Sequence, residues 1–178
     1  MEKQKNTPLL RFPEFNENWE IISLGNYIKI NSGISPNAYQ LSDSGRHPFI
    51  KVEELNNCEK YQKESRFYTN ETKNLIEVES IIFPKRGAAI LNNKVRINKV
   101  PLLMDSNLMA IKPINESLIS EFLYYTICKE KLYKIADTST IPQINNKHIE
   151  PYKLNVPKAI EQQKIASFLT AVDDKLQA

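Results

Sequence analysis

The chain has 178 residues, of which 41% are hydrophobic and 25% are charged. These values are typical of one globular domain with a short appendage, and they exclude a disordered chain. No apolar stretch approaches the roughly 18 residues of a membrane-spanning helix, and the N-terminal segment lacks the apolar run of an export signal. The net charge of +3 is too small to indicate a nucleic-acid-binding protein by itself, so the distribution of charge must decide.

The first half of the chain alternates loops with short apolar segments. Residues 19–30 fit either a short helix or a helix passing into a strand, and neither interpretation is favoured. The Ser, Asn, Pro and Gly content of residues 31–45 predicts a long functional loop. Residues 48–52 predict a strand, and residues 70–78 predict a short helix capped by Asn70.

The middle of the chain carries the strongest strand signal. The β-branched and aromatic run at 80–84 predicts a buried strand. It leads into residues 85–104, which predict a strand–turn–strand hairpin with Asn92 and Asn93 at its turn. Residues 107–112 predict a further strand.

The C-terminal part is more helical. Apolar residues at helical spacing predict a helix over 116–136, with Asn115 as its cap. Residues 153–156 predict a strand, and a last helix is predicted from about residue 160 to the chain end. Helices mixed with five or more short strands, without regular βαβ alternation, indicate a mixed α/β, α+β-like fold.

The positive charge is concentrated in the predicted hairpin. Five cations and no acid lie between positions 85 and 104, namely Lys85, Arg86, Lys94, Arg96 and Lys99. Because side chains alternate along a strand, Lys94 and Arg96 should share a face with Asn92. Cations neutralise phosphates and amides read base edges, so this segment predicts a DNA-contacting surface. A solvated basic hairpin is the alternative.

A second polar cluster lies between positions 138 and 147, where Ser139, Thr140, Gln143 and Asn145 carry hydroxyls and amides. These groups exchange hydrogen bonds with bases and phosphates, but they are equally the ordinary residues of a loop. The same applies to the loop that contains Ser32 and Ser35.

The last predicted helix carries an apolar seam. Ile165, Leu169, Val172 and Leu176 are spaced 4, 3 and 4 residues apart, and Phe168 lies beside them. This spacing is typical of a coiled coil. An amphipathic helix that packs on the core of its own domain would show the same pattern, so both interpretations stay open.

The motifs of common enzymes are missing from the sequence. The four glycines form neither a dinucleotide fingerprint nor a phosphate-binding loop. The two cysteines and two histidines have no ligand spacing, which predicts no metal site and two reduced thiols in a cytoplasmic protein. Glu71-Thr72-Lys73 resembles a nuclease fragment, but an acid at a helix start explains it equally. A DNA-recognition module, a protein-interaction domain and a magnesium-dependent nuclease are the three alternatives.

Three segments together resemble the specificity subunit of type I restriction–modification enzymes. They are LRFPEF…W at 10–19, SIIFPKRGA at 80–88, and TSTIPQINNKHIEPYKLNVP…EQQKIASFL at 138–169. The resemblance implies a target-recognition domain over 1–157, with a small twisted sheet and flanking helices. It implies that residues 158–178 begin a coiled-coil-type spacer helix. The chain would then be a non-catalytic reader of one half of a bipartite sequence in double-stranded DNA.

The resemblance also assigns partners and roles. Methyltransferase subunits and restriction (translocase and nuclease) subunits would dock on the helix, and a second copy or second recognition domain would complete the reader. S-adenosylmethionine, ATP and magnesium would bind those partners and not this chain. Five phosphate contacts, from the five cations, would give log affinity a slope of about −4.5 against log salt. Base contacts would fall to the Ser32–Asn37 loop and to Asn92, Ser139, Thr140, Gln143 and Asn145, and Asn93 would also contact DNA. Assembly would fall to Ile165, Phe168, Leu169, Val172 and Leu176.

Overall fold

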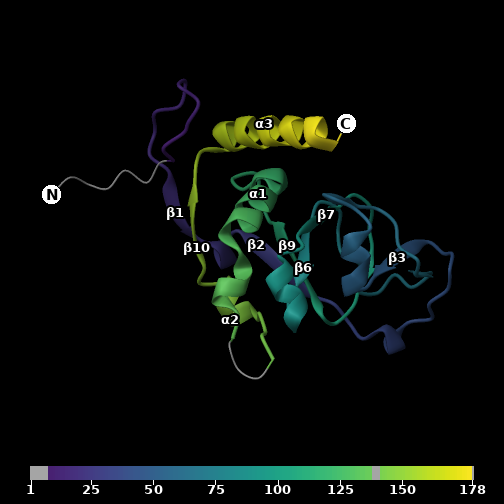
Figure 1. Cartoon of the computed structure of the whole chain (residues 1–178). Helices are drawn as coiled ribbons and strands as arrows, with labels where there is room; N and C mark the ends of the chain where they lie inside the picture. The colour runs from purple at the N-terminus through teal and green to yellow at the C-terminus, as the bar shows by residue number, and fades with distance from the viewer. Residues whose placement is uncertain (1–7, 138–140, 178) are drawn as a thin grey trace.

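A computed structural model describes residues 8–137 and 141–177, and it contains three sheets and three α-helices within those ranges (Figure 1). The strands are β1 (Glu20–Ser23), β2 (Ile28–Ser32), β3 (His47–Ile50), β4 (Tyr61–Gln62), β5 (Tyr68–Thr69), β6 (Ile81–Pro84), β7 (Arg96–Asn98), β8 (Leu103–Met104), β9 (Leu108–Pro113) and β10 (Lys153–Val156). The α-helices are α1 (Ser120–Glu130), α2 (Asn146–Ile149) and α3 (Ala159–Gln177). The mixed α/β fold class is therefore confirmed.

The central sheet has the strand order β2-β9-β6-β7-β4, and its middle strands are buried on both faces. Along β6, Ile81 and Phe83 point into one apolar cluster, and Ile82 points into another. Successive side chains on a strand point to opposite faces, so one continuous apolar run builds two cores. This is why SIIFP reads as an unbroken hydrophobic segment.

The first core lies between the central sheet and the helices. Phe122, Leu123 and Ile127 of α1 and Ala166 of α3 pack there against the sheet. Figure 1 shows α3 lying across the end of α1, with α2 at the opposite end of the molecule.

The second core joins the central sheet to a smaller lobe. That lobe is the three-stranded sheet β5-β3-β8, in which β3 pairs parallel to β8 and antiparallel to β5. Ile50, Leu102 and Met104 of this lobe pack against Ile82 and Leu108 of the central sheet.

A pair of strands ties the two ends of the chain together. β1 pairs antiparallel with β10, from Glu20 opposite Val156 to Ser23 opposite Lys153. The N-terminal arm that precedes β1 is bound to α3 through Glu161. This residue is 3% exposed. Arg11 donates two hydrogen bonds of 2.7 Å to the Glu161 carboxylate, and Trp19 Nε1 donates one of 3.2 Å.

Several predicted elements are confirmed. The strands predicted at 48–52, 80–84, 107–112 and 153–156 are β3, β6, β9 and β10, within one or two residues at their ends. The last predicted helix is α3.

Other elements differ from prediction. Residues 19–30 form β1, a 3₁₀ turn at Leu24–Asn26 and the start of β2, so neither helical interpretation is right. Residues 70–78 form no helix, because Asn74 has a positive φ of 65° and Ile76 forms a β-bridge with Leu102. The expected helix 116–136 is broken at Lys131, whose φ of 58° separates α1 from a 3₁₀ helix at Leu132–Ile135.

The predicted hairpin is right only in its second strand, β7, because residues 88–92 form a 3₁₀ helix where its first strand was expected. β6 and β7 pair antiparallel, with Ile81 opposite Ile97. They are joined by a longer connection that contains the 3₁₀ helix Ala88–Asn92, and not by a tight turn at Asn92-Asn93. Within residues 8–137 and 141–177, no helix is long and apolar enough to cross a membrane, and no cluster of His, Cys, Asp or Glu could hold a metal ion.

Candidate nucleic-acid interface

One edge of the central sheet gathers polar side chains from several segments. β2 and β6 are both antiparallel to β9, so they are parallel to each other and end at the same edge. Ser32 ends β2, and Lys85 directly follows β6. The Lys85 ammonium donates a hydrogen bond of 2.9 Å to Ser32 Oγ, which joins residues 53 positions apart.

Residues 142–144 are held against the segment that follows β6. Ile144 N donates to Lys85 O at 2.8 Å, and Gly87 N donates to Pro142 O at 2.9 Å. Arg86 and Gln143 therefore form an antiparallel β-bridge. Backbone hydrogen bonds, rather than side-chain contacts, place the exposed Arg86 beside the amide of Gln143.

A close backbone approach fixes the Ser32 loop at this edge. Gly33 N donates to Leu108 O, and Ile34 N donates to Met104 O. A Cβ on Gly33 would lie only 1.9 Å from the carbonyl oxygen of Asp105, so no side chain fits there. Glycine at this position lets the loop cross the β8–β9 turn and keeps Ser32 next to Lys85.

Among the described residues, the cations at this edge have no carboxylate partner. In the described part of the chain, no ion pair involves Lys85, Arg86 or Lys94, although ten ion pairs form elsewhere. Partial burial lowers the pKa of Lys85, and the adjacent charge of Arg86 lowers it further. Two cations held together without an anion favour binding of a phosphate, which would relieve their repulsion.

Nearby carboxylates are occupied by other groups. Asp105 Oδ1 accepts hydrogen bonds from Asn107 N, Asn107 Nδ2 and Ser106 Oγ, at 2.7, 2.9 and 3.3 Å. Asp137 accepts a bond of 3.3 Å from Lys147. These acids shape turns and do not neutralise Lys85 or Arg86.

Arg96 does not belong to the interface. It is 6% exposed, and its guanidinium donates to Leu55 O at 2.9 Å and to Val95 O at 2.7 Å. The prediction that Arg96 contacts a phosphate is therefore wrong, because its donors are used inside the fold.

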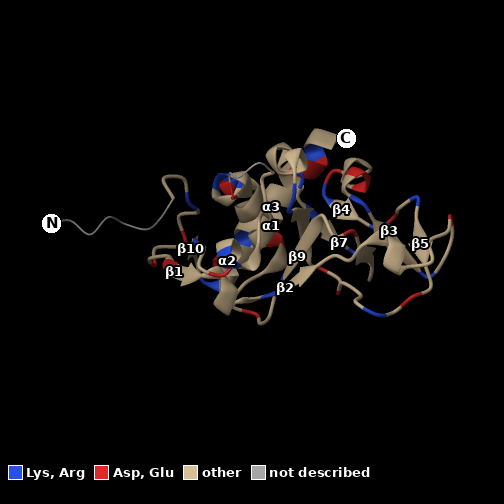
Figure 2. Ribbon diagram, turned by 90° about the horizontal axis from the view of Figure 1, so that it is seen from below, with Lys and Arg blue, Asp and Glu red and all other residues tan. Residues whose placement is uncertain are grey.

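Lys99 is surrounded by acids. Its ammonium lies 3.2 Å from Glu121 and 3.6 Å from Glu79, and 4.6 Å from the ring centroid of Tyr61. A phosphate contact at Lys99 stays a prediction, but the local charge balance opposes it. Figure 2 shows Lys and Arg spread over several elements and interleaved with Asp and Glu, so the basic segment does not make one basic face.

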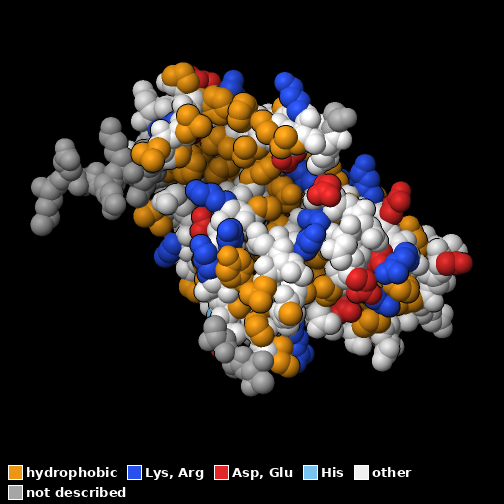
Figure 3. All heavy atoms as spheres, viewed as in Figure 1, with side chains coloured by type: hydrophobic (Ala, Val, Ile, Leu, Met, Phe, Trp, Pro, Cys, Tyr) orange, Lys and Arg blue, Asp and Glu red, His pale blue; other side chains and the backbone are white. Residues whose placement is uncertain are grey.

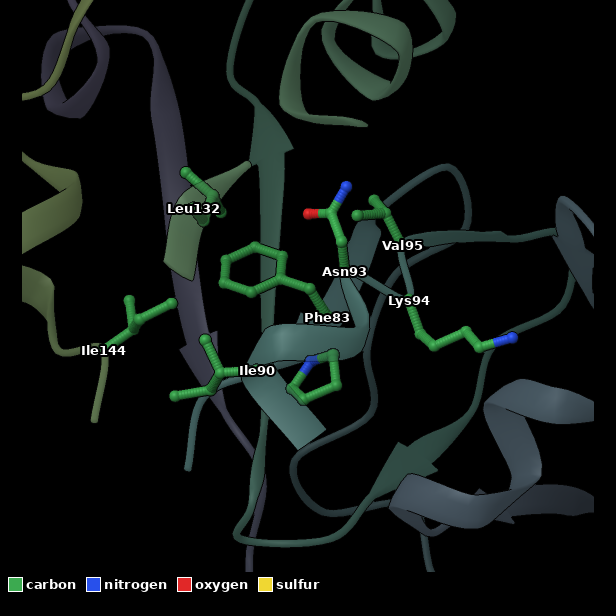
Figure 4. Close-up of a pocket in the computed structure, with 8 residues that line it drawn as sticks. Phe83, Ile90, Asn93, Lys94, Val95, Leu132 and Ile144 are labelled. Carbon is green, nitrogen blue, oxygen red and sulfur yellow. The ribbon is translucent and has the colours of Figure 1, made fainter. Parts of the chain in front are cut away.

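The residues in the middle of the basic segment also differ in role, since one is structural and the others are accessible. Asn93 has a φ of 48°, and its amide donates to Cys128 O at 2.9 Å, which makes it structural. Asn92 is exposed at the end of the 3₁₀ helix. In Figure 4, Phe83, Ile90, Leu132 and Ile144 surround a small apolar cavity, and the half-buried Lys94 points its amine away from it. The cavity belongs to the core, and Lys94 remains available to an anion.

The predicted base-reading residues are only partly brought together. Gln143 Nε2 donates to Asn145 Oδ1 at 3.1 Å, and Asn145 caps α2 through the bond from its backbone N to His148 Nδ1. Ser35 is exposed at the start of the 3₁₀ helix Pro36–Ala38. Ser139 and Thr140 lie outside the described residues.

The predicted assembly residues of α3 differ in their exposure to solvent. Ile165 and Leu169 are half-buried and line a groove of about 830 Å³, whose walls also include Phe12, Phe122 and Phe168. Phe168, Val172 and Leu176 are 54%, 38% and 82% exposed. Figure 3 shows apolar side chains gathered along this side of the molecule. Ile165 packs on the core, and the seam is therefore partly a domain-packing face.

The sequence did not reveal the β8–β9 turn as part of this edge. Asn107 O accepts a 2.8 Å hydrogen bond from Lys85 N, and exposed Ser106 adds a hydroxyl. The Asp-Ser-Asn run between two apolar segments signals a turn. Only the strand order shows that this turn lies beside Lys85. The fold and this edge together define a mixed α/β domain with cations that no described carboxylate pairs on one side, and on the other an amphipathic helix with exposed apolar residues.

Comparison with known proteins identifies the family. The chain matches the family described as the type I restriction modification DNA specificity domain over residues 16–178, and it belongs to that family. Two similar curated proteins are the MjaIX and MjaVIII type I restriction enzyme specificity subunits of Methanocaldococcus jannaschii. They are 28% and 26% identical over 97% and 93% of this chain, and the matches cover 41% and 37% of the relatives.

Solved structures share the fold. The HsdS subunit from Thermoanaerobacter tengcongensis superposes with a TM-score of 0.70 and 16% identity, over 93% of this chain and 40% of that subunit. A chain from a structural study of complex assembly in the type I R-M system gives 0.75 at 16% identity, over 93% and 41%. The present chain thus spans about two fifths of the length of the proteins it matches.

Proposed function

We propose that this chain is a non-catalytic reader of one half of a bipartite double-stranded DNA target. The observation that carries the proposal is the sheet edge at which Lys85 and Arg86 lie beside Ser32 and Gln143, with no carboxylate partner in residues 8–137 and 141–177. Lys85 and Arg86 would anchor phosphates, and Lys94 would add a contact at the side. The amide of Gln143 and the hydroxyls of Ser32 and Ser35 would face base edges.

The proposal extends to partners. Phe168, Val172 and Leu176 on α3 would dock methyltransferase and restriction subunits, or a second recognition domain. Those subunits would bind S-adenosylmethionine, ATP and magnesium, and they would extrude and modify the target base. The proposal keeps a recognition domain over residues 1–157 and a spacer helix that begins at residue 158. The protein would act in the cytoplasm, where its DNA and its partners are.

The structure changes the expected salt dependence. Of the five cations in the basic segment, Arg96 is buried and Lys99 is balanced by acids, which leaves three. Three phosphate contacts give a slope of about −2.7, or roughly a 40-fold loss of affinity between 50 and 200 mM salt.

The test is binding of random-sequence 30-bp duplexes across that salt range. Arg86→Glu should weaken binding about tenfold at 50 mM salt and reduce the slope by about 1, because one phosphate contact is lost. Lys175→Glu is the matched control, since it makes the same change of charge on exposed α3, at the opposite side of the molecule (Figure 1). Equal effects of the two variants, or affinity that does not depend on salt, would contradict the proposal.

The assembly proposal needs a separate measurement. Val172→Glu with Leu176→Glu should abolish co-purification with the modification subunits, because two carboxylates would enter an apolar contact. The double variant should bind random duplexes as the parent does. Unchanged co-purification would show that α3 is not the docking surface.

A further inference from the structure

A buried lysine connects the central sheet directly to α3. Lys60 precedes the edge strand β4, and its backbone O accepts a hydrogen bond of 2.9 Å from Ile97 of β7. The residue is 6% exposed. Its side chain reaches Thr170 on α3, 110 positions away in sequence.

The ammonium has an ion-pair partner and two hydrogen-bond acceptors on the helices. Lys60 Nζ lies 2.7 Å from Glu121 Oε2 and 2.9 Å from the Tyr125 hydroxyl, both on α1. It lies 2.8 Å from Thr170 Oγ1 on α3. The ion pair and the two hydrogen bonds therefore hold the ammonium at the point where the sheet, α1 and α3 meet.

Three tyrosine rings surround the ammonium of Lys60 and add favourable contacts to it. The ammonium lies 4.9, 5.3 and 4.5 Å from the ring centroids of Tyr61, Tyr124 and Tyr125, each within the range of a cation–π contact. Leaving a buried ammonium with one partner missing is costly, so the three contacts act together.

Further hydrogen bonds extend the contact along α3. The Tyr125 hydroxyl donates to Asp173 Oδ2 at 2.6 Å, one turn beyond Thr170. On the other side, Tyr61 and Lys99 donate to Glu121 Oε1 at 2.9 and 3.2 Å. Asp174, the next residue on α3, is exposed and takes no part in this network.

The start of α3 is fixed independently. Gln162 is fully buried, and its Nε2 donates to Ser117 O and Pro157 O, both at 2.8 Å, and its Oε1 accepts from Ile119 N at 2.9 Å. A helix held only there could pivot about its first turn. From residue 162 to residue 177 the helix extends about 22 Å, so a swing of 10° would move its end by about 4 Å.

We propose that Lys60 is a positioning residue that sets the direction in which α3 leaves the recognition body, through its bonds to Thr170 and to Tyr125. The geometric claim concerns this chain alone. Its consequence, that a partner docked on α3 takes a fixed orientation relative to the DNA-facing edge, rests on the proposed function.

The experiment measures the distance between nitroxide labels by double electron–electron resonance. The labels replace exposed Lys175 on α3 and exposed Asn56 in the small lobe, in a background where Cys58 and Cys128 are replaced by serine. Thr170→Val removes the acceptor on α3 without changing the side-chain shape, and Lys60→Met removes the ammonium. Thr170→Ser keeps the hydroxyl and is the matched control.

Thr170→Val and Lys60→Met should each at least double the width of the distance distribution, at temperatures where circular dichroism shows the chain folded. Thr170→Ser should retain the parent distribution. A parent-like distribution in Thr170→Val overturns the proposal, and so does a folded Lys60→Met variant that matches the parent. If Lys60→Met does not fold, Thr170→Val decides alone.

Binding of random duplexes separates this claim from the proposed function. Thr170→Val should bind them within twofold of the parent, because the junction lies away from Lys85 and Arg86. A wider distribution with parent-like binding supports the positioning role. Failure of Arg86→Glu to weaken binding would count against the DNA-reading function and would leave the distance result unaffected.

Discussion

The cations at the Lys85 edge and the cations around α3 differ in whether a carboxylate pairs with them. At the edge, Lys85 and Arg86 meet hydroxyls and amides, and no ion pair within the described ranges engages them. Around α3, the buried Lys60 pairs with Glu121 and the half-buried Arg11 pairs with Glu161. Paired charges of this kind hold the fold, and unpaired cations are free to bind an anion. Counting basic residues along the sequence cannot make that distinction, because it depends on which carboxylates the fold brings near.

The largest expected effect distinguishes Arg96 from Arg86. Arg96→Ala should lower the free energy of unfolding by about 3 kcal/mol, because it leaves the carbonyls of Leu55 and Val95 without donors and opens a cavity. Arg86→Ala should change it by less than about 0.5 kcal/mol, since Arg86 is exposed. Urea titration followed by circular dichroism measures both. Similar losses from the two variants would erase the distinction between structural and functional cations.

A smaller effect concerns a paired acid in the small lobe. Glu54 has a fully buried side chain and accepts bonds from Arg66 N, Arg66 Nε and Ser65 Oγ. Burial alone would raise the pKa of Glu54, but the bonds from Arg66 and Ser65 outweigh burial and hold that pKa below its ordinary value of 4.5. Its stabilisation is therefore complete above pH 4.5 and is lost as the pH falls below it.

Glu54→Gln tests this. The variant should be about 2 kcal/mol less stable at pH 7, where the carboxylate is charged. The difference from the parent should shrink as the pH falls below 4.5, and urea titrations between pH 3 and 7 measure it. Glu53→Gln, at an exposed neighbouring position, is the control and should show no such trend. A difference that stays constant with pH would show that the charge of Glu54 contributes nothing.

The elements that the sequence predicted well are those whose signal is local. The β-branched run of β6 and the helical spacing of α3 are read from adjacent residues. The failures depend on distant partners. Ile76 pairs with Leu102, which prevents the helix expected at 70–78, and Arg96 is buried because Leu55 supplies a carbonyl 41 positions away.

The candidate site was predictable only in part for the same reason. The cations at 85 and 86 and the amide at 143 stand out in the sequence, but their adjacency comes from the backbone bonds of Gly87 and Ile144. Likewise, the EQQ segment of α3 carries part of the family resemblance, but the sequence does not show what its side chains contact. Glu161 binds the N-terminal arm and Gln162 binds the segment before α1, so these two residues orient the helix from inside the domain.

Sequence preference should depend on Gln143 more than on its neighbours. Gln143→Ala removes an amide beside Arg86 and should reduce discrimination at one base pair by about 1 kcal/mol, with little change in the salt slope. Selection from a random duplex library, followed by sequencing, measures this. Asn146→Ala is the control, because that exposed amide lies on the following helix. Loss of affinity without loss of preference would make Gln143 a phosphate contact.

The smallest expected effect is the dependence of DNA binding on high pH. Burial and the charge of Arg86 lower the pKa of Lys85, and a bound phosphate would raise it again, since it favours the charged ammonium. The affinity for DNA is then highest below the pKa that Lys85 has in the free protein, and it falls as the pH rises through that pKa. Between pH 7 and 9.5 the parent should lose affinity by no more than about threefold. The Lys85→Arg variant should not show this loss of affinity, because a guanidinium stays charged over the same pH range. Equal pH profiles for parent and Lys85→Arg would mean that the ammonium of Lys85 does not contact the phosphate, and would leave Arg86 and Lys94 as the anchoring cations.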